Sequence, residues 1–107
     1  MIFLTQEKDI TITGLQSLYF YSSWMPHHKK MMSMLSKMEQ KYKDMGFFAV
    51  DVDFFKAFCK RFNVTSIPTI IVLNNGKELR RINGLVLTSA LRSTFADICD
   101  SIGDING

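Results

Sequence analysis

The junction at residues 24–29, Trp-Met-Pro-His-His-Lys, constrains the fold more than any other segment, because a strand pattern passes directly into a helix pattern there. Residues 16–22 are apolar and aromatic between polar neighbours, which is typical of a buried strand. Residues 27–43 contain neither glycine nor proline, and their apolar residues keep the spacing of one helical face: Met31, Leu35 and Met38. Pro26 suits the first turn of this helix, where its missing N–H is tolerated. A strand leading so directly into a helix predicts packing of a sheet against helices.

Further strand patterns occur along the chain, and we expect strands at residues 2–4, 47–52, 68–73 and 78–82. The last two flank Asn74-Asn75-Gly76, which predicts a hairpin turn. The Met-Gly pair at residues 45–46 is expected to end the helix that begins near residue 27.

Two more helices are expected. The first is short and presents one apolar face: Phe54, Phe55, Phe58, Cys59 and Phe62. The second is terminal, is capped by Thr88 or Ser89, and presents another apolar face: Leu91, Phe95, Ile98, Cys99 and Ile102. The order β, β, α, β, α, β, β, α in 107 residues predicts a single α/β domain over residues 1–107.

The spacing of a few residues points to a family. Residues 24–29 hold the frame of a Trp-Cys-x-x-Cys-Lys redox motif, and Pro68 lies 44 residues after Trp24, directly before an apolar strand. Gly76 and Gly84 follow at intervals of eight, and Val-Asp-Val-Asp at residues 50–53 fits the end of a central strand. Residues 1–100 therefore resemble the thioredoxin family. The resemblance implies a thioredoxin-like fold, a central mixed β-sheet flanked by α-helices, with a cis peptide bond before Pro68.

The resemblance also implies that this chain lacks the family's chemistry. Met25 and His28 occupy the positions of the two redox-active cysteines, and neither side chain forms a disulfide. The family's buried aspartate is replaced by Tyr19, and the lysine that accompanies it by Ala49. We therefore expect no catalytic residue at these positions and, on balance, no enzyme.

The resemblance further implies a peptide-binding groove. An extended partner segment pairs with the backbone before the cis-proline in such folds, and methionine adds an adaptable apolar contact. The residues expected to line the groove are Trp24, Met25, Pro26, Ile67, Pro68 and Gly84. The leading hypothesis is a redox-inactive module that binds a protein or an extended peptide.

Two alternatives stay open. The chain is a thiol-disulfide oxidoreductase of the thioredoxin class if Cys59 is reactive, or if its native motif differs from residues 25–28. It is a metal-binding protein if Met25, His27 and His28 act as ligands, because a thioether and imidazoles suit copper. Two facing ligands are few for a tight site, so we expect neither a metal nor another cofactor.

Composition and charge argue against nucleic-acid-binding, membrane-spanning and secreted proteins. The net charge is +3, but the basic pairs at residues 29–30, 60–61 and 80–81 are dispersed, so we expect no nucleic-acid partner. No apolar run reaches the length of a membrane span, and the N-terminal residues lack a signal-peptide pattern. We therefore expect a cytoplasmic monomer without a membrane partner.

Overall fold

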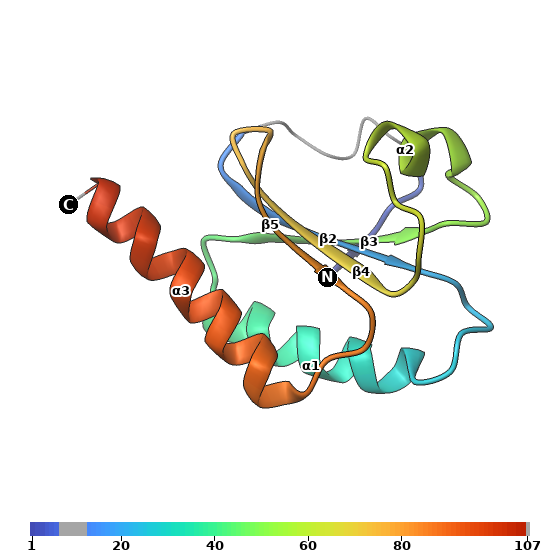
Figure 1. The fold of residues 1–107 in the computed structure, drawn as a ribbon, viewed down its shortest axis with the longest axis horizontal. Helices are drawn as coiled ribbons and strands as arrows, with labels where there is room; N and C mark the ends of the chain where they lie inside the picture. Colours follow the sequence, from blue (N-terminus) through green and yellow to red (C-terminus); the bar gives the residue numbers. More distant parts are fainter. Residues whose placement is uncertain (7–12, 107) are drawn as a thin grey trace.

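The computed structural model describes residues 1–6 and 13–106, and its elements follow the expected order (Figure 1). The strands are β1 (Ile2–Phe3), β2 (Leu15–Tyr21), β3 (Gly46–Asp51), β4 (Thr69–Asn74) and β5 (Lys77–Asn83). The helices are α1 (His28–Lys41), α2 (Lys56–Arg61) and α3 (Thr88–Asn106). The predicted α/β class is confirmed.

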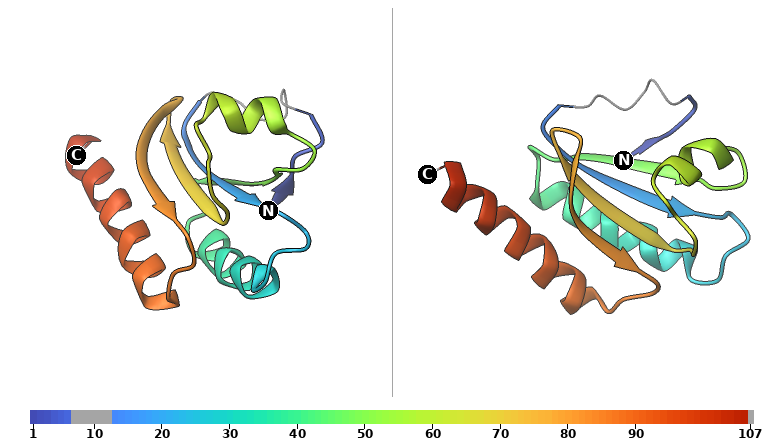
Figure 2. Two further views of the ribbon diagram at one scale, coloured as in Figure 1. Left: turned by 45° about the vertical axis from the view of Figure 1, so that its right-hand side comes forward. Right: turned by 45° about the horizontal axis from the view of Figure 1, so that its top comes forward.

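The strands form one mixed sheet in the order β1-β3-β2-β4-β5. Strand β3 runs parallel to both β1 and β2, whereas β4 runs antiparallel to β2 and to β5. Helices α1 and α3 lie against one face of the sheet and α2 against the other (Figure 2). The prediction of a central mixed sheet flanked by helices is therefore correct.

Alternation along β2 divides the interior into two cores. Tyr19 and Tyr21 belong to the core between the sheet and α1 and α3, while Leu18 and Phe20 belong to the core beneath α2. Successive side chains of a strand point to opposite faces, so this one strand contributes to both cores. All four side chains are buried.

The expected bounds of the first helix were wrong at both ends. His27 has a left-handed backbone with φ 64°, so α1 begins only at His28 and Pro26 precedes it. At the other end α1 stops at Lys41, and the Tyr42 N–H caps it by donating to the Met38 carbonyl at 2.8 Å. Gly46 does not end the helix, because it already opens β3.

The prediction for the second helix was wrong at its start. The amides of Phe54 and Phe55 both donate to the Asp51 carbonyl, at 3.2 and 3.1 Å, in the turn that follows β3. Helix α2 therefore begins at Lys56, and the side chain of Phe54 stays 81% exposed instead of joining the core.

Arg81 ties α2 to the edge of the sheet. Its guanidinium donates to the carbonyls of Phe62, at 2.6 Å, and Asn63, at 3.1 Å, which follow the last turn of α2. It also pairs with Glu78 at 2.8 Å on its own strand. The planar guanidinium thus donates hydrogen bonds to the two carbonyls that follow α2 and to the carboxylate on β5.

We predict that Arg81→Lys lowers the free energy of unfolding by about 1–2 kcal/mol, because an ammonium group cannot reach both carbonyls and the carboxylate together. Urea denaturation measures the change. Arg80→Lys is the matched control, since Arg80 is exposed on the same strand. Equal effects of the two substitutions would show that the Arg81 contacts add nothing to stability.

Candidate functional site

The loop of residues 22–27 connects β2 to α1 and is held by short hydrogen bonds. The Met25 N–H donates to the Ser22 carbonyl at 3.0 Å, and the Ser22 hydroxyl donates to the Asp53 carboxylate at 2.8 Å. The second bond joins this loop to the turn after β3. Trp24, at the tip of the loop, is 71% exposed.

Met25 turns inward from this loop. Its side chain is 8% exposed and belongs to the core shared with α1 and α3. The residue expected to contact a ligand thus offers little surface to one, and its thioether is largely shielded from solvent. Burial fits an unbranched apolar side chain that fills irregular space in a core.

His28 contacts the residue that replaces the buried aspartate. The Tyr19 hydroxyl and the His28 Nδ1 lie 3.0 Å apart. The imidazole also stacks on the ring of Tyr21, with centroids 4.5 Å apart and 11° between the planes. The rings of Tyr19 and Tyr21 also stack, with centroids 5.4 Å apart. The three rings therefore form one aromatic cluster below the start of α1. Spacing in the sequence gave no signal of this contact.

Burial keeps the Tyr19 hydroxyl protonated. The Tyr19 side chain is fully buried, and desolvation, with a smaller effect of Tyr21, raises the pKa of its hydroxyl well above the usual tyrosine range. The phenol therefore stays protonated at neutral pH and shares its hydrogen bond with His28 Nδ1, and the tautomer of the imidazole sets which atom donates.

The second wall of the site is formed around the cis Ile67–Pro68 peptide bond. The Gly84 N–H donates to the Pro68 carbonyl at 2.8 Å, which ties the loop after β5 to the start of β4. The Thr69 hydroxyl donates to the Ser66 carbonyl at 2.7 Å and holds the preceding turn. Within residues 1–6 and 13–106, the Ile67 backbone takes part in no hydrogen bond, so its N–H and C=O are open to a partner strand.

Strand register brings these two walls together. Phe20 pairs with Thr69 across β2 and β4, so the loop that follows β2 lies beside the residues that precede β4. Trp24 and Pro26 are exposed there, Ile67 and Gly84 are half-buried, and Pro68 is buried. Five of the six expected groove residues therefore border one site, and Met25 lies beneath it.

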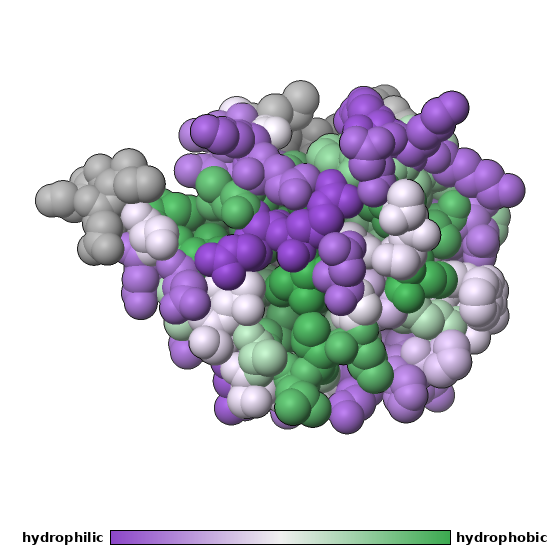
Figure 3. Space-filling view, in the orientation of Figure 1, coloured by the Kyte–Doolittle hydropathy of each residue, from purple (hydrophilic) through white to green (hydrophobic). Residues whose placement is uncertain are grey.

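The site carries exposed apolar side chains that the sequence did not identify. Phe54 follows β3, and Leu85 and Leu87, which are 51% and 72% exposed, follow β5. Hydrophobic side chains gather over the connection between β5 and α3 (Figure 3). Leu85 directly follows Gly84, and this adjacency is the sequence signal that could have assigned it to the rim.

The two cysteines are free and lie on opposite faces of the sheet. Cys59 belongs to the core beneath α2, and burial, followed by the Asp51 carboxylate, raises the pKa of its thiol. Cys99 packs on the other core, and burial, followed by Asp100, raises the pKa of its thiol, against an opposing effect of Lys41. The sheet separates the two sulfur atoms, so they cannot form a disulfide with each other.

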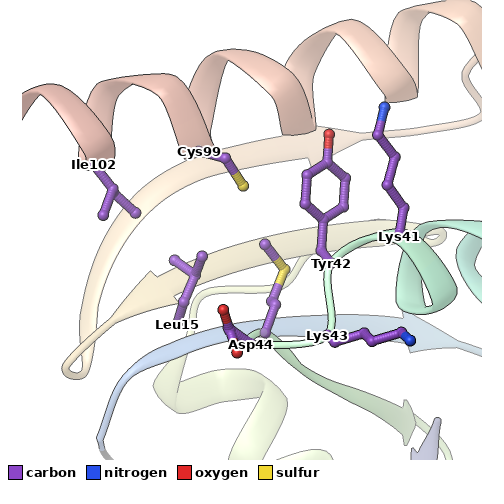
Figure 4. Close-up of a pocket in the computed structure, with 8 residues that line it drawn as sticks. Leu15, Lys41, Tyr42, Lys43, Asp44, Cys99 and Ile102 are labelled. Atoms are coloured by element: carbon purple, nitrogen blue, oxygen red, sulfur yellow. The ribbon is translucent and has the colours of Figure 1, made fainter.

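Cys99 lines a separate cavity of about 290 Å³. Cys99 enters the cavity from α3, across from Leu15 at the start of β2 and beside Tyr42 (Figure 4). This end of β2 is opposite to the 22–27 loop, so the cavity is not part of the groove.

The candidate metal ligands do not converge. Met25 is buried, His27 is exposed, and His28 Nδ1 is already hydrogen-bonded to the Tyr19 hydroxyl. In the part of the chain that the structure describes, no three histidine, cysteine or acidic residues are grouped to hold a metal ion.

None of the described helices is long and apolar enough to span a membrane.

Comparison with known proteins gives consistent matches. The Thioredoxin family model matches residues 6–97. Thioredoxin H2 of Arabidopsis thaliana is 35% identical over 65 residues, and Thioredoxin-2 of Saccharomyces cerevisiae is 32% identical over 65 residues. These alignments cover 61% of this chain but 49% and 62% of the two proteins, so the chain matches only about half to three-fifths of their length.

Solved structures match over more of the chain. The oxidised thioredoxin from Plasmodium falciparum has a TM-score of 0.82 at 25% identity, covering 91% of this chain and 96% of that one. Mitochondrial Thioredoxin 3 from Saccharomyces cerevisiae, in its oxidised form, has a TM-score of 0.79 at 28% identity, covering 91% and 94%.

We predict an energetic coupling of about 1 kcal/mol between Tyr19 and His28, the size of one buried hydrogen bond. Tyr19→Phe, which keeps the ring, should lower the free energy of unfolding by about that amount. In a His28→Ala background the same substitution should have little effect or should stabilise, because it removes a hydroxyl that has lost its partner.

Urea denaturation of the two single variants and the double variant completes this cycle. Tyr42→Phe is the control, since the Tyr42 hydroxyl has no hydrogen-bond partner among the described residues. Additive effects of Tyr19→Phe and His28→Ala would contradict the coupling.

Proposed function

This chain belongs to the thioredoxin family, and we propose that it is a redox-inactive member that binds an extended peptide or protein segment. The observation that carries the proposal is the state of the two positions where the family has its cysteines. Met25 is packed in the core, and His28 is hydrogen-bonded to Tyr19 and stacked on Tyr21. The Ile67 backbone before the cis peptide bond takes part in no hydrogen bond among the described residues, which leaves it available to a partner segment.

Dithiol chemistry requires an exposed thiolate and a second thiol beside it. Met25 has no proton to lose, and the His28 ring is engaged by Tyr19 and Tyr21. Cys59 and Cys99 do not substitute for the missing pair, because burial raises both pKa values and the sheet lies between them. A raised pKa leaves the unreactive thiol dominant near neutral pH.

The groove offers what an extended segment needs. The open N–H and C=O of Ile67 can pair with a partner backbone, as in the addition of a β-strand. Trp24, Phe54 and Leu85 are exposed apolar side chains in the loops that follow β2, β3 and β5. Exposed aromatic residues are typical of binding sites that anchor a partner.

The proposal includes a cytoplasmic setting. Both cysteines are free, which suits a reducing compartment, and neither is placed to form an internal disulfide. The partner is a different protein or peptide, bound by the chain as a monomer.

We predict that the chain does not accelerate reduction of insulin by dithiothreitol, because residues 25–28 hold no thiol. The Met25→Cys/His28→Cys double variant should gain activity on the same frame. Thiol-dependent acceleration by the unsubstituted chain, lost on alkylation of Cys59, would instead support an oxidoreductase.

We predict that peptides selected on the chain from a random phage-displayed library lose about tenfold or more in affinity when Trp24 is changed to alanine. Anisotropy of the labelled peptide gives the dissociation constant. Leu79→Ala is the control for general apolar adhesion, since Leu79 is also exposed but lies on β5. Binding that is indifferent to Trp24, or failure to select any peptide, would refute the proposal.

A further inference from the structure

The groove continues past Ile67 into a hollow beneath α2. Two adjoining cavities, of about 190 and 350 Å³, make up this hollow. Four residues line both cavities: Val52, Cys59, Val64 and Thr65. The smaller cavity reaches Ser66 and Ile67, at the groove, and the larger one reaches Lys56 and Lys60 on α2. A ligand seated on the Ile67 backbone therefore lies directly beside the hollow.

The floor of the hollow is apolar. Val52 and Val64 are half-buried members of the core edge beneath α2, and Cys59 is a buried residue of the same core. A buried thiol behaves as a small hydrophobic group. This floor suits an aliphatic side chain of a bound segment and offers no buried charge to a polar one.

The rim of the hollow is basic. Lys56 and Lys60 are four residues apart and therefore lie on one side of α2, and both are exposed. Among the residues that the structure describes, neither lysine pairs with a carboxylate. The acids of the nearby turn have other partners, because Asp53 accepts the Ser22 hydroxyl and Asp51 accepts the Asp53 N–H. Within the described residues, both ammonium groups are therefore available to a partner's carboxylates.

We propose that the segment bound in the groove carries an aliphatic side chain that enters the hollow beside Ile67, followed by acidic residues that contact Lys56 and Lys60. This inference rests on the proposed function and adds to it the chemical class of the partner: an extended, apolar and acidic peptide. The basic rim gives selectivity between partners, because like charges brought to it would be repelled.

Charge reversal tests the rim. A random phage-displayed peptide library is selected in parallel on the unsubstituted chain, on Lys56→Glu/Lys60→Glu, and on Lys37→Glu/Lys77→Glu. The last variant makes the same change of charge at exposed positions on α1 and β5. Acidic residues beside an aliphatic one should be enriched by the unsubstituted chain and by the control. The rim variant should instead bind those peptides about tenfold more weakly, as expected for two exposed ion pairs.

Amide chemical shifts of the chain, titrated with a synthetic version of the most enriched peptide, test the position of the aliphatic side chain. The resonances of Cys59, Val64 and Thr65 should shift together with those of Trp24 and Gly84. Cys99 and Ile102, which line the distant cavity, should not shift.

The possible outcomes distinguish failure of this inference from failure of the proposed function. Shifts at Trp24 and Gly84 without shifts at the hollow, or enrichment that ignores charge, would overturn this inference and leave the groove as a peptide site. Failure to enrich any peptide on the unsubstituted chain would overturn both.

Discussion

The burial of β2 on both faces is the constraint on which the rest of the structure depends. This strand pairs in parallel with β3 and antiparallel with β4, and its side chains alternate between the two cores. A shift of register by one residue would exchange those cores, so the pairing is strongly specified. The pairing of Phe20 with Thr69 then sets the loop of Trp24 beside the cis Ile67–Pro68 bond. The groove is thus a consequence of strand register rather than of the loops alone.

The altered residues of the site are coupled through the same strand. Tyr19 projects from β2 into the core that also receives Met25, and its hydroxyl meets the imidazole of His28. An aspartate and a cysteine at these two positions serve proton and thiol chemistry in thioredoxins. Here a neutral phenol and an imidazole fill the space with stacked rings and one hydrogen bond. The interior of the site is therefore filled by packed side chains, whereas Trp24 at the tip of its loop stays exposed.

The sequence predicted the order of elements, the hairpin at Asn75-Gly76 and the mixed sheet, because these follow from periodicity and turn chemistry. It did not predict the start of α1, since the left-handed conformation of His27 is a local choice that helix spacing does not reveal. Phe54 was assigned to the core from spacing alone, although the turn after β3 delays α2 until Lys56. The contact between Tyr19 and His28 depends on tertiary packing, so the two positions could be identified from the sequence but their interaction could not.

The Tyr19–His28 contact also limits which substitutions at these two positions evolution can accept singly. A single substitution of His28 by cysteine would leave a buried hydroxyl without a partner, at a cost of about 1–3 kcal/mol. A single substitution of Tyr19 by aspartate would bury a carboxyl group beneath the stacked rings, where desolvation disfavours its charged form. Each of these two single substitutions passes through a less stable protein. We therefore expect Tyr19 and His28 to change together rather than one at a time, which is epistasis between two residues in contact.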